Sequence, residues 1–164
     1  MILVAGKLKL IKPLTPTSLQ ILHVDGKIGH WIVLSTMDCA KDEVKVYDLL
    51  YTSVNDDTQT VIAALINSKS PHIKIKLMNI AKQFGGTDCG LYAIAIITCL
   101  AYGEDPTCLV FDKTMLRPHL VECFEKRAFT HFLSVKDEEW HKQLLQSKYV
   151  LFIVYADYQN IMDP

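Results

Sequence analysis

The sequence lacks an apolar run long enough to span a bilayer. Its longest apolar stretch, residues 91–102, is shorter than the roughly 20 residues of a transmembrane helix and contains Thr98. The apolar start of the chain is interrupted by Gly6 and Lys7 before the core of a signal peptide could form. Net charge is also nearly absent, at −1, so no bulk electrostatic attraction favours nucleic acid. We therefore expect neither a membrane nor a nucleic acid as partner.

The sequence also lacks paired cysteines. Its five cysteines are odd in number, and no two of them have a Cys-x-x-Cys spacing; they are Cys39, Cys89, Cys99, Cys108 and Cys123. This pattern argues against a disulfide framework and against a zinc site. We expect no metal and no organic cofactor, and a reducing intracellular compartment, in the cytoplasm or nucleus.

The order of apolar patterns predicts an α+β fold in a chain of 164 residues, long enough for a sizeable core. Strands are predicted at 18–24, 30–37, 44–48, 73–77 and 149–155, with a hairpin turn at 25–27. Helices are predicted at 58–67, after caps at 55–57, at 88–102 and at 137–147. The 88–102 helix is apolar almost all round, so we expect a mixed sheet of four or five strands packed around it as a buried central helix.

A further helix is predicted after residue 111. Asp112 can cap it, although Pro118 also allows a start nearer Arg117. We expect its inner face to carry Leu120, Val121 and Phe124. Gly103 is expected to terminate the preceding helix.

A cysteine stands where a glycine-rich loop turns into the apolar helix, in the segment 83–90, Gln-Phe-Gly-Gly-Thr-Asp-Cys-Gly. Asp88 or Thr87 can cap this helix, because a short side-chain oxygen accepts a bond from a free first-turn N–H. Cys89 would then lie in the first turn, where the helix dipole favours the thiolate, which is the nucleophile. Gly85 and Gly86 leave room for a substrate to lie close to the sulfur.

A cysteine nucleophile needs a base and an acceptor that orients the base. His30 is the first residue of the predicted 30–37 strand, and Asp48 is the last residue of the predicted 44–48 strand. If the two strands form a hairpin through the polar link at 38–43, the start of the first lies beside the end of the second. We therefore predict that His30 lies next to Asp48. Gln83, six residues before Cys89, can supply an amide to an oxyanion hole.

This order of motifs resembles a known family. His30-Trp31, Asp48 about a strand pair later, and Gln83 five residues before Asp88-Cys89-Gly90 are similar to the ubiquitin-like-protein proteases, which are adenain-like cysteine peptidases of clan CE. The likeness covers roughly residues 19–124. It is closest to uncharacterised animal members that carry the Tyr-Asp-x-Leu-Tyr and Arg-Pro-His-Leu segments seen here at 47–51 and 117–120.

The resemblance implies a thiol protease or isopeptidase that cleaves after the C-terminal glycine of a ubiquitin-like modifier, with that modifier or its conjugate as partner. It implies that Cys89, His30, Asp48 and Gln83 are catalytic. It also implies that Trp31 covers a narrow groove for a Gly-Gly tail, which would run over Gly85 and Gly86. Residues 1–133 would form the catalytic domain, and residues 134–164 an unassigned extension of helix plus strand that could add an edge strand or make an interface.

Two other functions stay open. Family members usually have a longer portion before the histidine, including a second tryptophan, whereas 29 residues precede His30 here and none is Trp. A catalytically inactive, mobile-element-derived binding module would fit this difference. Bacterial acetyltransferases with the same triad pass the acyl group to an acceptor other than water, but the sequence shows no basic pocket for an acyl-CoA.

Overall fold

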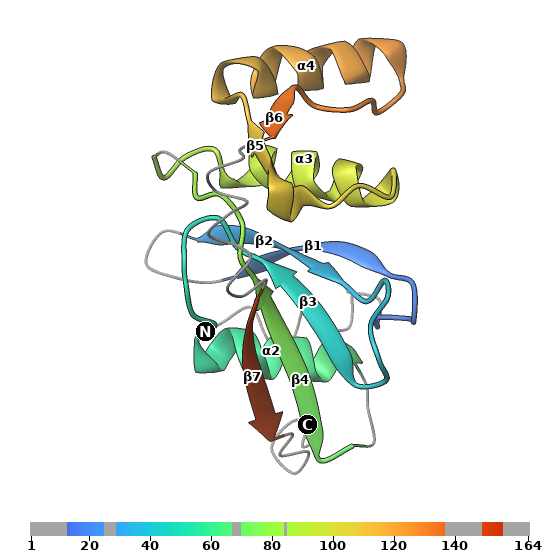
Figure 1. Cartoon of the computed structure of the whole chain (residues 1–164), viewed down its shortest axis with the longest axis vertical. Coiled ribbons are helices and arrows are strands. Elements are labelled where there is room, and N and C mark those ends of the chain that lie inside the picture. Colours follow the sequence, from blue (N-terminus) through green and yellow to red (C-terminus); the bar gives the residue numbers. More distant parts are fainter. Residues whose placement is uncertain (1–12, 25–28, 67–69, 84, 137–148, 156–164) are drawn as a thin grey trace.

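A five-stranded mixed β-sheet forms the middle of the structure, a computed structural model that describes residues 13–24, 29–66, 70–83, 85–136 and 149–155 (Figure 1). Its order is β1-β2-β3-β4-β7. The strands are β1 (Leu19–Val24), β2 (His30–Ser35), β3 (Glu43–Tyr47), β4 (His72–Met78) and β7 (Tyr149–Tyr155). Only β3 and β4 are parallel, and the other neighbours are antiparallel. The predicted α+β fold with a mixed sheet is confirmed.

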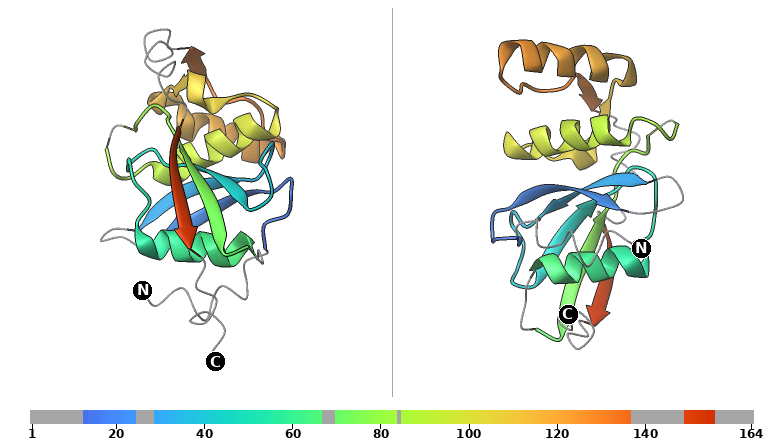
Figure 2. Two further views of the ribbon diagram at one scale, coloured as in Figure 1. Left: turned by 60° about the horizontal axis from the view of Figure 1, so that its bottom comes forward. Right: turned by 180° about the vertical axis from the view of Figure 1, so that it is seen from behind.

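Helix α2 (Asp56–Ile66) makes the crossover between β3 and β4 that a parallel pair requires. Asn55 caps it as predicted, because its Oδ1 accepts the backbone N–H of Thr58 at 2.8 Å. The helix covers one face of the sheet (Figure 2). The core on this side is built from Leu22, Ile32, Leu34, Val44, Val46, Ile62, Ala63, Leu65, Ile73, Ile75 and Leu77.

Helix α3 (Cys89–Ala101) covers the opposite face of the sheet and lies between it and α4 (Figures 1 and 2). Val33 faces α3 while its neighbours Ile32 and Leu34 face α2, so β2 is buried on both faces, as its continuous apolar sequence predicts. Gly103, with φ +78°, ends α3 as predicted. Its N–H and that of Glu104 bond the last carbonyls of the helix in a Schellman motif.

Helix α4 (Lys113–Lys126) starts at its Asp112 cap and therefore contains Pro118. The predicted inner face is wrong at two positions. The residues that turn toward α3 are Leu116, Leu120 and Cys123, spaced i, i+4, i+7, whereas Val121 and Phe124 are 55 % and 64 % exposed. Leu116 and Leu120 pack with the cluster that contains the buried residues of α3, and this packing sets the inner face; the ring of Phe124 meets that of Phe129.

Three short elements around α4 have no counterpart in the sequence prediction. A 3₁₀ turn, η2 (Pro106–Cys108), leads into β5 (Leu109–Phe111), which pairs antiparallel with β6 (Ser134–Lys136). The predicted turn at 25–27 and the predicted helix at 137–147 lie outside the described residues. The predicted strand at 149–155 is β7, which adds an edge strand next to β4. Of the helices in the described ranges, none combines the length and the apolar character needed to cross a membrane.

Candidate active site

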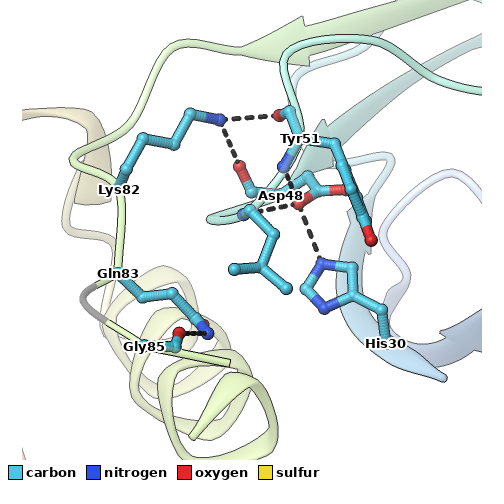
Figure 3. A network of polar contacts seen from close by, with 7 residues as sticks. His30, Asp48, Tyr51, Lys82, Gln83 and Gly85 are labelled. Atoms are coloured by element: carbon cyan, nitrogen blue, oxygen red, sulfur yellow. Dashed lines mark hydrogen bonds and ion pairs between the residues drawn. The ribbon is translucent and has the colours of Figure 1, made fainter. Parts of the chain in front are cut away.

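Asp48 follows the last residue of β3, and one oxygen of its carboxylate accepts three hydrogen bonds (Figure 3). Oδ1 accepts Nε2–H of His30 at 2.8 Å, the backbone N–H of Leu50 at 2.8 Å and that of Tyr51 at 2.9 Å. His30 and Asp48 are both buried, with 2 % and 6 % of their surface exposed. The β2–β3 hairpin therefore brings these two side chains together, as its predicted pairing requires.

This contact decides which nitrogen of His30 remains available. An ionised carboxylate only accepts hydrogen bonds, so the shared proton lies on Nε2 and the neutral ring keeps its lone pair on Nδ1. Nδ1 is buried and has no hydrogen-bond partner among the described residues. The Tyr51 ring meets the imidazole edge to face at 5.4 Å. Asp48 and Tyr51 thus hold the His30 imidazole from two sides, and its Nδ1 makes no hydrogen bond to the described residues.

Lys82 ties a second segment to this loop, and nothing in the sequence pointed to it. Its Nζ donates to the main-chain oxygens of Asp48 at 2.9 Å and Tyr51 at 2.6 Å. The N–H of the next residue, Gln83, donates to the Leu49 carbonyl at 3.2 Å. Burial lowers the pKa of Lys82. The position of Gln83 is therefore fixed relative to the loop that carries Asp48 (Figure 3).

Gln83 is buried, and its side-chain amide bonds the main chain two residues further on. Nε2 donates to the carbonyl of Gly85 at 2.6 Å, which uses one of its two hydrogens. Oε1 has no partner among the described residues. Gly85 has φ +87°, a conformation that side chains other than glycine's rarely allow, and both Gly85 and Gly86 are exposed.

Cys89 is the first residue of α3 and is buried, with 7 % of its surface exposed. Trp31, 40 % exposed, lies over the same turn: its Cδ1 is 3.4 Å from where a Cβ on Gly90 would stand. Because Trp31 follows His30 in β2, the start of β2 lies alongside the start of α3. No hydrogen bond joins Cys89 to His30, since Nδ1 has no partner in the described part of the chain.

The predicted cap of α3 is wrong in its contacts. Asp88 occupies the cap position but makes no side-chain cap bond. Instead Oδ1 accepts from Arg117 of α4 at 2.7 Å, and Oδ2 lies 3.4 Å from Nζ of Lys113. These two cations, Arg117 first, lower the pKa of Asp88. The Asp88 carbonyl accepts the N–H groups of Leu91 and Tyr92. Cys89 is the first residue of the helix, and its N–H therefore has no acceptor within the helix.

We expect Asp88→Asn to lower the stability of the fold near neutral pH, with the loss shrinking in acid. The pKa of Asp88 is below its ordinary value of 3.8 in the folded chain. The unfolded state therefore takes up the proton first, so the contribution of this carboxylate is fully present above about pH 4 and disappears as the pH falls through the lowered pKa. Urea unfolding of both proteins over a pH series measures this. A difference that is constant across the series would contradict it.

The remaining cysteines and histidines lie elsewhere. All five cysteines are free. Cys99 and Cys123 are buried in the core, whereas Cys108 is half-buried. His131 also meets a carboxylate, that of Glu104 at 3.2 Å, but this exposed pair follows the far end of α3, about 20 Å from Cys89 at 1.5 Å per helical residue.

The described residues contain no group of three or more His, Cys, Asp or Glu side chains that could hold a metal ion. The predicted site residues and Lys82 supply an imidazole, a carboxylate, an amide and an ammonium group, and His30 contacts Asp48. Such a set can move a proton and stabilise a developing negative charge.

The chain matches a protein-family model. Residues 14–128 match the model of the Ulp1 protease family, C-terminal catalytic domain. The matched region runs from before β1 to just after α4 and contains His30, Asp48, Gln83 and Cys89. Comparisons with curated proteins and with solved structures gave no match.

Proposed function

The chain belongs to the Ulp1 protease family, and from this premise we propose that it is a cysteine peptidase or isopeptidase acting on a ubiquitin-like modifier. The proposed cleavage follows the C-terminal glycine of the modifier. The observation that carries the proposal is the buried contact of His30 with Asp48, which leaves one imidazole nitrogen free beside the helix that begins at Cys89. A buried imidazole oriented by a carboxylate is the base that a thiol nucleophile requires.

In the proposed reaction, Nδ1 of His30 takes the proton of the Cys89 thiol, and the thiolate attacks the glycine carbonyl carbon. The C–N bond then breaks, and the leaving amine takes the proton back from His30. Water next attacks the thioester with His30 again as base, which releases the glycine carboxylate and restores the thiol. Asp48 holds the tautomer and stabilises the imidazolium. The Cys89–His30 contact is expected to close when substrate binds, because catalytic hydrogen bonds are often long without it.

Two N–H donors would stabilise the oxyanion. The backbone N–H of Cys89 has no acceptor within α3, because Cys89 is the first residue of the helix. The Gln83 amide keeps a second hydrogen after its bond to Gly85. A helix N-terminus adds its dipole to these donors. Loss of one such donor typically costs about a hundred- to thousand-fold in rate.

The proposed substrate groove favours residues without side chains. The Trp31 Cδ1 lies 3.4 Å from where a Cβ on Gly90 would stand, and the loop before the helix carries exposed Gly85 and Gly86. A side chain at Gly90 would already touch the indole, so the space beneath the ring is low. A Gly-Gly tail would fit there and bulkier residues would not, which makes a ubiquitin-like protein the proposed partner. The free cysteines support a reducing, intracellular location.

The test is reaction with a panel of ubiquitin-like proteins, ubiquitin and SUMO among them, that carry C-terminal electrophiles. One member is expected to form a covalent adduct at Cys89, detected by intact mass and peptide mapping. A modifier that ends in Ala-Ala is the control and should not react. If a folded sample reacts with no member of the panel, the chain is a non-catalytic binding module.

A further inference from the structure

The outer edge of β7 carries the strongest feature that the proposed reaction does not use. β7 pairs with β4 on one side, and no described strand pairs with its other side. A strand at the edge of a sheet presents unpaired N–H and C=O groups, which can bind another strand. Figure 1 shows β7 at the side of the sheet, with α3 and α4 packed at another end of the molecule.

Strand β7 itself contains none of the residues that normally protect an edge strand. The strand reads Tyr-Val-Leu-Phe-Ile-Val-Tyr and contains no charged residue, proline or glycine. Natural proteins use such residues to keep edges from pairing. Instead Val150, Leu151 and Ile153 are 53 %, 47 % and 54 % exposed. Since neighbouring strand residues point to opposite faces, apolar surface is open on both faces of the strand.

The sequence of β7 is also symmetric about Phe152. Tyr stands three residues to either side of it, Val two residues to either side, and Leu or Ile one residue to either side. In an antiparallel pair of two identical strands, such a sequence places each residue opposite one of its own kind. Like-sized β-branched and aromatic pairs are favourable across antiparallel strands.

We infer that the outer edge of β7 binds the β7 of a second copy of this chain, antiparallel and across a two-fold axis at Phe152. Phe152 then faces the partner's Phe152, Val150 faces the partner's Val154, and Leu151 faces the partner's Ile153. The two five-stranded sheets become one continuous sheet. A two-fold interface needs a self-complementary surface, and this strand supplies one from its own sequence.

A second copy fits this edge better than a foreign strand. The strand carries no charge that a partner of opposite charge would recognise. Its symmetric sequence matches like residues only against a second copy of itself, and an unrelated strand would lack these pairs. Lys76 lies beside Leu151 on β4, but Glu43 neutralises it at 2.6 Å, so the flank of the strand adds little repulsion. One pair of seven-residue strands makes a small interface, and interfaces well below the standard of roughly 1,600 Å² are weak, so we expect the dimer to dissociate on dilution.

The first experiment measures mass against concentration for the full chain, by sedimentation velocity. We expect a shift from monomer to dimer as concentration rises. Leu151→Lys should raise the dissociation constant at least tenfold, because the ammonium group would lie against the partner's Ile153. Val121→Lys is the matched control, since it changes an equally exposed valine on α4 and should leave the constant unchanged. A monomer at every concentration, or equal effects of the two variants, would overturn the inference.

The second experiment tests the register by disulfide formation under mild oxidation. In Phe152→Cys the two new residues face each other with Cα atoms about 5 Å apart, within the range of a disulfide. In Val150→Cys they lie about 14 Å apart, at about 3.4 Å per residue over four residues, and cannot be joined. We expect a covalent dimer from the first variant alone, above the background of the unmodified chain. Crosslinking in Val150→Cys without Phe152→Cys would reject the register.

Discussion

Cys89→Ala is expected to abolish cleavage of a modifier that reacts with the unmodified protein. The substitution removes the sulfur that forms the thioester in the proposed reaction. The fall in kcat should be at least about a thousand-fold, since losing a nucleophile leaves only the catalysis due to binding and the oxyanion hole. Release of a fluorescent amine from the modifier's C-terminus measures it.

Cys99→Ala is the control, because it changes a cysteine of the same helix. Cys99 is buried, and burial raises the pKa of its thiol to about 12, so it holds its proton at neutral pH. It also lies ten positions further along α3. The variant should lose some stability through packing and keep its kcat. Equal loss of activity in both variants, with Cys99→Ala still folded, would contradict the assignment of Cys89.

His30→Gln is expected to have the second-largest effect. Glutamine can still donate to Asp48 from its amide, so the buried carboxylate keeps a partner. The variant has no basic nitrogen in place of Nδ1, however, and general base catalysis contributes about 10²- to 10⁴-fold. We expect kcat to fall within that range. The pH–rate profile should also lose the limb that reports the ionisation of the histidine.

His131→Gln is the matched control. His131 also meets a carboxylate, but it is exposed and stands past the far end of α3. It should therefore leave kcat and the pH–rate profile unchanged. If His30→Gln cleaves as fast as the unmodified protein, or if both variants lose activity equally, His30 is not the base.

Local patterns were sufficient to predict the elements that build the proposed site. Two predicted strands and a short polar link between them predicted the β2–β3 hairpin, and the hairpin brings His30 to Asp48. A continuous apolar sequence predicted that α3 is buried. These features depend on neighbours in the sequence, so the sequence contains what determines them.

Contacts between distant segments could not be predicted in the same way. Asp88 is a residue type that often caps helices, yet its side chain accepts a hydrogen bond from Arg117 because α4 packs close by. Lys82 bonds two carbonyls, and any lysine in a loop would look the same in the sequence. The face of α4 was assigned wrongly because the helix has two neighbouring apolar stripes, one residue or about 100° apart, and its packing against the rest of the chain selects between them. Such choices depend on the packing of the whole chain.

The pairing of β7 with β4 has a practical consequence for anyone who trims this protein. A fragment that ends at residue 128 keeps the whole family match and all four proposed catalytic residues, yet it deletes β7 and β6. The peptide groups of β4 that bond β7 would then be open along seven residues, beside the buried Ile73 and Ile75. Such a fragment is expected to express poorly and to precipitate, so a domain boundary drawn from the family alone would discard part of the sheet that holds the site in shape.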